Sequence, residues 1–169
     1  MVIIREFNNE DLEDVKLFAL LAQKRESTYN PNLKTDEEAY NFLHAWLRES
    51  ISTGGKIFVA EEQGENVGFA WGWIIRKPSE LYKVERIGYI YQVYVKEEKK
   101  REIREKLLSE LIRYFKEKRI KHVIADCYAN DLETIKLYEK FGFRPQALTL
   151  MRRLKNDGEE ATSGNVRPL

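Results

Sequence analysis

The chain has 169 residues, a length that suits one domain with a sizeable hydrophobic core. Hydrophobic residues make up 43% of it and charged residues 34%, which is a globular composition. The formal net charge is only +1, so no strong overall field attracts nucleic acid or an anionic membrane, and we expect neither partner.

The first third of the chain predicts one strand followed by two helices. Residues 2–7 form a β-branched run, and apolar residues at helical spacing continue from there to Glu26. The pair Thr35 and Glu38 is typical of a capping box that starts the second helix. The apolar stripe of that helix consists of Ala39, Phe42, Leu43, Trp46 and Leu47, and Gly54 and Gly55 suit its end.

Three strands are predicted next. Residues 56–62 and 67–75 flank a connection of hairpin length that contains Gly64, so they form an antiparallel pair. Residues 87–95 form the third strand, and strict alternation divides its side chains between two faces. One face carries Tyr89, Tyr91 and Val93, and the other carries Ile90, Gln92 and Tyr94.

The rest of the chain predicts a helix over 100–118, a strand over 122–128, a helix that Asn130 or Asp131 caps, and a strand over 146–154. The first of these helices is a crossover connection, which makes strands 87–95 and 122–128 parallel and the sheet mixed. The expected order is β-α-α-β-β-β-α-β-α-β. Residues 155–169 are polar and aperiodic, so we expect a domain over 1–154 and a disordered tail over 155–169.

The first residues, the lack of a long apolar run and the single cysteine favour a cytoplasmic protein. The first residues lack the basic and long apolar segments of a signal peptide, and no apolar run approaches membrane-spanning length. Cys127 stands alone, which excludes an internal disulfide and predicts a buried filler residue. His44 and His122 lack ligand-spaced partners, so we expect no metal site.

Two segments resemble motifs of the GNAT N-acetyltransferases. The run from Leu137 to Phe143, LYEKFGF, resembles their carboxy-proximal signature, and Val93-Tyr94-Val95 before a charged loop resembles their cofactor-binding segment. The match covers roughly residues 1–154. It implies an α/β fold with a mixed, mostly antiparallel central sheet flanked by helices. It also implies transfer of an acetyl group from acetyl-CoA, as co-substrate, to a primary amine of a protein, polyamine or small molecule.

The resemblance also implies roles for particular residues. In the family two parallel strands splay apart, so the backbone of Val93, Tyr94 and Val95 would pair with the pantetheine arm and polarise the thioester carbonyl. Tyr138 would protonate the departing thiolate, although a half-buried core aromatic is the alternative for this residue. The remaining cofactor-binding positions carried over from the family are Lys100, Arg101, Ile103, Arg104 and Asp131.

The sequence departs from the family pattern in three respects. Lys100, Glu102 and Arg104 stand where the family has the glycines that admit a pyrophosphate, so a solvated helix face with a Glu102–Lys106 pair is an equal alternative. Asp131 replaces the usual asparagine, which favours helix capping. Gln92 occupies the site of an acid in many relatives, so a base must come from water, from Glu85 or from residues 26–36.

Two hypotheses for the function follow: an acetyltransferase, and a non-catalytic GNAT-fold module that binds a ligand or a partner. The signature around Tyr138 favours the enzyme, and the missing glycines favour the module. Trp71 and Trp73 share a strand face and are expected in the core rather than in an acceptor pocket. Residues 29–32 are where the family shapes its acceptor site. The oligomeric state stays open, with a homodimer as one option.

Overall fold

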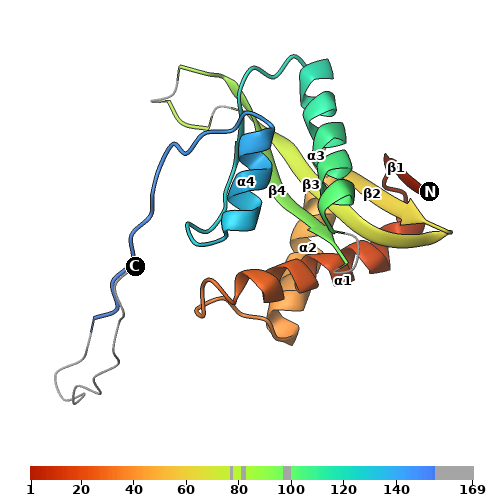
Figure 1. Cartoon of the computed structure of the whole chain (residues 1–169), viewed down its shortest axis with the longest axis horizontal. Helices are drawn as coiled ribbons and strands as arrows, with labels where there is room; N and C mark the ends of the chain where they lie inside the picture. The colour runs from red at the N-terminus through yellow and green to blue at the C-terminus, as the bar shows by residue number, and fades with distance from the viewer. Residues whose placement is uncertain (77, 81–82, 97–99, 155–169) are drawn as a thin grey trace.

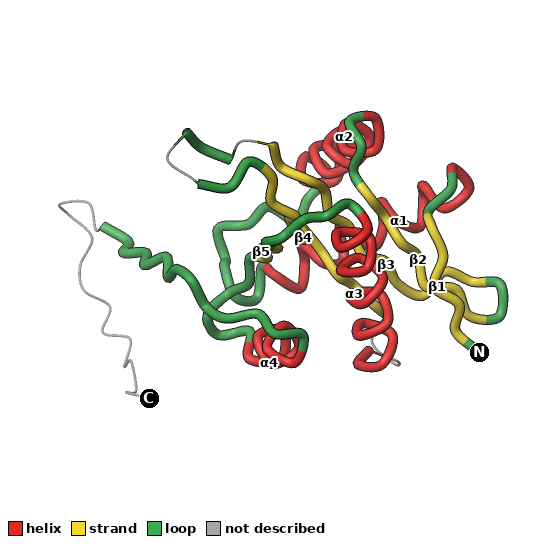
Figure 2. Tube along the Cα trace, turned by 90° about the horizontal axis from the view of Figure 1, so that it is seen from above, coloured by secondary structure: helices red, strands yellow, loops and turns green. Residues whose placement is uncertain are grey.

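The computed structural model describes residues 1–76, 78–80, 83–96 and 100–154. Within them, a five-stranded sheet runs in the order β1-β2-β3-β4-β5. Helices α1 and α2 cover one face of this sheet and α3 and α4 cover the other (Figures 1 and 2). The elements are β1 Val2–Glu6, η1 Asn9–Asp11, α1 Leu12–Glu26, α2 Glu37–Ser52, β2 Lys56–Glu62, β3 Glu65–Arg76, β4 Arg86–Val95, α3 Lys100–Glu117, β5 Val123–Ala125 and α4 Leu132–Lys140.

The sheet is mixed, as predicted. β1, β2, β3 and β4 pair antiparallel in sequence, whereas β4 and β5 pair parallel across the crossover helix α3. The β2–β3 hairpin closes through Gln63 and Gly64, whose φ values are 54° and 83°. Two successive residues with positive φ match the twist of the flanking strands, which explains the tight connection. None of the described helices is long and apolar enough to cross a lipid bilayer.

The start of α2 differs from the predicted capping box. Asp36, rather than Thr35, is the N-cap, and its carboxylate accepts a hydrogen bond from the backbone N–H of Ala39 at 3.1 Å. A carboxylate at this position also interacts favourably with the helix dipole. One member of the predicted apolar stripe, Phe42, is 65% exposed, and its ring packs beside Trp46 with the centroids 6.0 Å apart.

The alternation predicted for β4 is wrong beyond Tyr91. Gln92 pairs with Trp71 of β3 and Ile90 pairs with Gly72, so Tyr91 is an extra residue that forms a β-bulge. The bulge shifts by one residue the alternation of side chains between the two faces of the sheet. As a result Tyr91 and Tyr94 pack on the α1–α2 face of the sheet, whereas Ile90, Val93 and Val95 pack on the α3–α4 face.

The strand predicted over residues 146–154 does not form. These residues contain no helix or strand, and the chain extends away from the sheet after α4 (Figure 1). Alternating apolar residues favour a strand, but a strand persists only where a neighbour takes its backbone hydrogen bonds. The predicted tail over 155–169 lies outside the described residues. Cys127, expected to be buried, is exposed because β5 ends before it.

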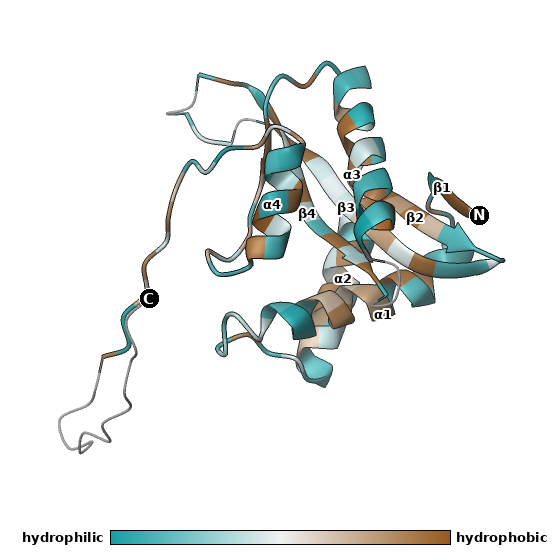
Figure 3. Cartoon of the chain, in the orientation of Figure 1, coloured by the Kyte–Doolittle hydropathy of each residue, from teal (hydrophilic) through white to brown (hydrophobic). Residues whose placement is uncertain are grey.

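Each face of the sheet carries its own core. On one side α3 shows an apolar stripe toward the sheet (Figure 3), formed by Leu107, Leu108, Leu111 and Phe115. Gly88 of β4 lies directly under this stripe, and a Cβ atom placed there would come within 2.9 Å of the Phe115 ring. The sheet and α3 therefore meet at a position where only glycine leaves room.

Gly88→Ala should lower the free energy of unfolding by about 1–3 kcal/mol, because the added methyl group forces the buried Phe115 ring to move. Urea unfolding followed by circular dichroism measures the change. In a Phe115→Leu background the same substitution should cost less, because the smaller side chain leaves room for it. An equal cost in both backgrounds would show that the ring is not the obstacle.

Candidate active site

The two parallel strands separate halfway along β4. They pair only at Gly88 with Val123, Tyr89 with Ile124 and Ile90 with Ala125. β5 ends there, while β4 continues to Val95 and remains paired with β3 on its other edge. In the described part of the chain, no strand pairs with the β5-facing edge of residues 91–95. The bulge at Tyr91 lies at the point of separation, where it turns the strand.

Tyr138 of α4 lies buried beside this gap. Its side chain belongs to the core cluster that contains Ile90 and Val95, and the residue is 8% exposed. Burial raises the pKa of its phenol well above the ordinary value, and the nearby Arg104 cation opposes the rise. Cys127, two residues beyond β5, is close enough to raise the pKa slightly further. Tyr138 is therefore protonated at neutral pH and can act as a proton donor.

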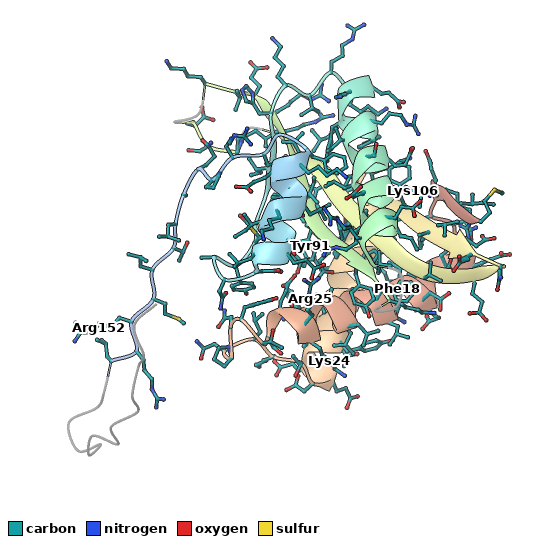
Figure 4. The ribbon with its side chains drawn as sticks, in the orientation of Figure 1. Phe18, Lys24, Arg25, Tyr91, Lys106 and Arg152 are labelled. Atoms are coloured by element: carbon teal, nitrogen blue, oxygen red, sulfur yellow. The ribbon has the colours of Figure 1, made fainter. Side chains whose placement is uncertain are left out.

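Glu26, the last residue of α1, carries an unusual carboxyl group. Burial raises its pKa to about 7; Asp131 adds to the rise, and Arg25 opposes it. The Glu26 charge in turn raises the pKa of Tyr91 and of Tyr138, which places the carboxyl near both phenols. Figure 4 shows Arg25 and Tyr91 in the same region, between α1, α4 and β4. A carboxyl that titrates near neutrality is suited to accept a proton.

Gln92 of β4, which the family resemblance places where an acid is expected, lies beside Glu26. It is 3% exposed, and its amide lies near enough to Glu26 to favour the charged form of that carboxyl. The contact falls short of a full hydrogen bond, because neither the nitrogen nor the oxygen of the Gln92 side chain has a partner among the described residues. Two unpaired buried polar atoms cost free energy, which is typical of a position that a ligand or water completes.

Ion pairs and hydrogen bonds hold α4 in its position beside the gap. Asp131 caps α4 by accepting a hydrogen bond from the Thr134 N–H at 3.1 Å, and it pairs with Arg25 at 3.4 Å. Arg104 of α3 is 4% exposed and donates to Glu133 and to the Thr134 hydroxyl, both at 2.9 Å. These contacts join α1, α3 and α4 around the gap. The guanidinium of Arg104 is thus directed at α4, and Asp131 serves as a helix cap.

The start of α3 presents charged pairs to solvent. Glu102 pairs with Lys106 at 2.7 Å, the exposed helix-face pair that the sequence offered as one alternative. Arg101 is exposed and pairs with Glu105 at 3.4 Å. Ile103 is buried in the core, so only its backbone is available to a ligand. Residues 97–99 and the Lys100 side chain lie outside the described part of the structure.

The loop between α1 and α2 reaches the segment that follows β5. The rings of Tyr29 and Tyr128 stack with centroids 6.0 Å apart, and the Asn30 side chain donates to the Tyr128 hydroxyl at 3.5 Å. The Tyr89 hydroxyl donates to Asp126 at 2.7 Å. This loop therefore forms a wall near the open end of the gap. The sequence placed residues 29–32 near an acceptor, but no local pattern indicated their contact with Tyr128.

The tryptophans pack on the α1–α2 face of the sheet, where their rings contact Tyr91. Trp71 is fully buried and donates to the Ser50 hydroxyl at 2.8 Å, which confirms the expected core role. Trp73 lines a cavity of about 560 Å³ near the start of β4, beside Arg76 and Arg86. That cavity is at the opposite end of β4 from the gap. Among the described residues, no group of three or more His, Cys, Asp and Glu side chains has a metal-binding arrangement.

Family membership rests on comparison with known proteins. The sequence model of the Acetyltransferase (GNAT) family matches residues 18–143, most of the chain and all of the elements around the gap. The chain belongs to the GNAT acetyltransferase family. A search of the curated proteins found no significant match.

Solved GNAT-type structures share the fold. A protein from Pyrococcus furiosus whose acetyl transferase activity is itself an assignment is 25% identical, with a TM-score of 0.69 over 91% of this chain and 100% of that one. Aminoglycoside N-acetyltransferase AAC(6')-Iy, in complex with CoA, is 16% identical, with a TM-score of 0.68 over 92% and 95%. A predicted acetyltransferase from Clostridium acetobutylicum, solved with acetyl-CoA, is 18% identical, with a TM-score of 0.69 over 90% and 96%.

Proposed function

We propose that this GNAT protein transfers an acetyl group from acetyl-CoA to a primary amine of a protein, polyamine or small molecule. The observation that carries the proposal is the edge of β4 beyond Ile90 with which no described strand pairs, flanked by a buried tyrosine and by a carboxyl that titrates near neutrality. Two structures of similar fold were solved with CoA or acetyl-CoA, which supports the choice of co-substrate.

The gap suits the arm of acetyl-CoA. The amide groups of the pantetheine arm need backbone hydrogen-bond partners, as an added strand does. Residues 91–95 have an edge that no described strand occupies. In this arrangement the co-substrate supplies the activated acetyl thioester. The backbone N–H groups among Val93, Tyr94 and Val95 hold the acetyl carbonyl and stabilise the negative charge that develops on its oxygen during attack.

Tyr138 supplies the proton that the leaving sulfur requires. An unperturbed phenol has a pKa of about 10 and a thiol one of about 8.5, so the transfer is slightly uphill in water. The burial that raises the Tyr138 pKa also raises that of the neighbouring Cys127 thiol. A thiolate that is released into the dry gap is also more basic than in water, so its pKa changes in the same direction as that of Tyr138.

Glu26 is the base for the acceptor in this proposal, and it belongs to one of the three sources that the sequence left open, which were water, Glu85 and residues 26–36. A primary amine has a pKa of about 10.4 and arrives as an ammonium ion, so it must lose a proton before or during attack. The carboxylate of Glu26 and the Asp126 carboxylate near Tyr89 favour a cation at the gap. The stacked rings of Tyr29 and Tyr128 offer further electron-rich surface to it.

The non-catalytic module is the second candidate, and one observation favours it. Glu102 stands in the first turn of α3, where the family places a glycine and a pyrophosphate approaches, and its carboxylate repels phosphate. Its pair with Lys106 reduces this repulsion. Binding of acetyl-CoA therefore separates the two candidates.

Calorimetric titration of acetyl-CoA into the protein should give a Kd in the micromolar range or tighter. The affinity should fall as salt is added, since phosphate groups contribute to it. Acetyl-pantetheine, which lacks the nucleotide, should bind more weakly but still compete. No heat at millimolar acetyl-CoA would leave only the binding module.

Tyr138→Phe should lower kcat about 10²-fold with little change in the affinity for acetyl-CoA, because the ring stays packed on Phe143 while the proton donor is lost. Steady-state kinetics with a primary amine and calorimetry measure the two quantities. Tyr114→Phe, on α3 and away from the gap, is the control and should leave kcat unchanged. An unaltered kcat in Tyr138→Phe would exclude this tyrosine as the acid.

Glu26→Gln should lower kcat/KM about 10²-fold at pH 8 and remove the rise in kcat/KM that we expect of the native protein through pH 7. Exposed Glu37 provides the control, since Glu37→Gln should keep both the rate and the pH profile. A profile in Glu26→Gln that still rises through pH 7 would assign the base elsewhere.

A measurement of stability distinguishes the loss of the base in Glu26→Gln from unfolding of the variant. The folded pKa of Glu26 is raised, so the folded state binds a proton more readily than the unfolded state between about pH 4.5 and 7. The stability that this group contributes is therefore present at low pH and lost as pH rises through 7. Glu26→Gln should accordingly gain stability relative to the native protein at pH 8, while its activity falls.

A further inference from the structure

The cavity beside Trp73 lies at the end of the sheet where β3 extends beyond β2. β2 begins at Lys56, opposite Gly72, so residues 73–76 of β3 pair only with β4 in the described part of the chain. Residues of α2, β3, β4 and α3 line the cavity, whose volume is about 560 Å³. Because α2 and α3 cover opposite faces of the sheet (Figure 1), both faces contribute walls around the edge of β3. A volume of this size is typical of small-molecule sites.

Aromatic rings form much of the cavity wall. Trp46 of α2 and Trp73 of β3 meet edge to face with their centroids 5.6 Å apart, and both residues are half-buried. On the other face of the sheet, Tyr114 of α3 and Ile74 of β3 pack against the second core cluster and line the cavity there. Aromatic surfaces of this kind favour a planar ring as a ligand. The cavity therefore offers a planar ligand an apolar surface on each side of the strand edge.

Three cations gather on the α3 side of this cavity. Arg76 of β3 and Arg86 of β4 stand directly opposite each other, and the ammonium of Lys118 lies 5.8 Å from the centre of the Tyr114 ring. Like charges in such a cross-strand pair destabilise a sheet. Among the described residues, no carboxylate forms an ion pair with either arginine. A bound anion would relieve the repulsion, which makes this wall of the cavity suited to an acid group.

The Tyr114 phenol places the Arg86 charge on this wall independently. Burial raises the pKa of Tyr114, and the nearby Arg86 cation opposes the rise. Among the described residues that line the cavity, the acid is Glu49, which belongs to α2. Positive charge thus lies on the α3 side, and the carboxylate lies on the α2 side. A ligand with an acid group at one end fits this arrangement in one orientation.

The cavity is separate from the acetyl-transfer gap. Tyr91, where the gap begins, is five residues beyond Arg86 along β4, which is about 17 Å at about 3.3 Å per residue. The rings of Trp46 and Trp73 contact Tyr91, so aromatic side chains pack between the two sites. An amine acceptor arrives as a cation, and the arginines would repel it. The cavity therefore suits a different ligand from the acceptor of the proposed reaction.

We propose that this cavity is a second ligand site, which binds a small planar organic anion: an aromatic ring that carries a carboxylate or a phosphate group. The ring packs on Trp46 and Trp73, and the acid group pairs with Arg76 and Arg86. Guanidinium groups bind both kinds of oxyanion with two parallel hydrogen bonds. In this orientation the acid group lies away from Glu49. The inference goes beyond the acetyltransferase function and does not depend on it.

Anilinonaphthalene sulfonate, a planar aromatic anion, is the probe for this site. The three tryptophans of the chain are Trp46, Trp73 and Trp71, which packs against both of them, so energy transfer from tryptophan to the probe reports on this region. Titration should show one bound probe per chain, a Kd in the micromolar range and efficient energy transfer. Phenylnaphthylamine, which lacks the sulfonate, should bind about 10-fold more weakly. Equal affinity for the two probes would overturn the proposal.

Arg76→Gln and Arg86→Gln should each weaken binding of anilinonaphthalene sulfonate about 10-fold, because each removes one of the two guanidinium groups. Urea unfolding checks that the variants fold, and neither midpoint should fall, since each substitution ends the repulsion between like charges. Lys116→Gln is the matched control. It removes a cation of α3 that is not among the described residues lining the cavity, and it should leave the affinity unchanged. Binding that neither arginine substitution weakens would contradict the assignment.

Competition identifies the acid group of the ligand. Naphthoate and naphthyl phosphate share one ring system and differ only in the acid, so whichever displaces the probe at the lower concentration shows whether the site prefers a carboxylate or a phosphate. Acetyl-pantetheine, which is uncharged and fits the gap, should not displace the probe. Displacement by acetyl-pantetheine would place the probe in the gap, and failure of both naphthalene acids to displace it would also reject the second site.

Discussion

The structure depends on one constraint, which is that every backbone N–H and C=O group in a sheet must find a partner. β4 satisfies this against β3 except at the bulged Tyr91, but β5 accompanies it for only three residues. From Tyr91 to Val95 one edge of a central strand lacks a strand partner among the described residues. The bulge at Tyr91 coincides with this point and turns the strand where the pairing stops. The gap, the surrounding tyrosines and the proposed chemistry all follow from the early end of β5.

Buried charge keeps the walls of the gap in place. Arg104 loses its hydration in the interior, and the carboxylate of Glu133 with the Thr134 hydroxyl replaces part of it. These contacts fix the first turn of α4, so that Tyr138, one turn further on, is held against the sheet. The nearby Arg25 and Gln92 only partly offset the burial of Glu26, and its pKa rises. The same interior therefore contains a cation whose pKa burial lowers, which hydrogen bonds to α4 hold in place, and a carboxyl group that titrates near neutrality.

One strand edge explains the proposed function. In the described part of the chain, no strand pairs with the β5-facing edge of β4 beyond Ile90, and such an edge suits a slender ligand with amide groups. The early end of β5 therefore leaves room for the arm of acetyl-CoA.

The sequence by itself determined the features that local periodicity specifies. The apolar stripes gave α1, α2 and α3 nearly to the residue, the hairpin at Gly64 was recognisable, and the crossover fixed the parallel pair. The run LYEKFGF indicated the family, which the comparison with known proteins then established. Tertiary structure decided the phase of β4 after Tyr91, the burial of Arg104, the pKa of Glu26 and the absence of a strand after α4. Each of these depends on which distant segments lie nearby, because a bulge, a desolvated charge and a strand edge are defined only by their neighbours.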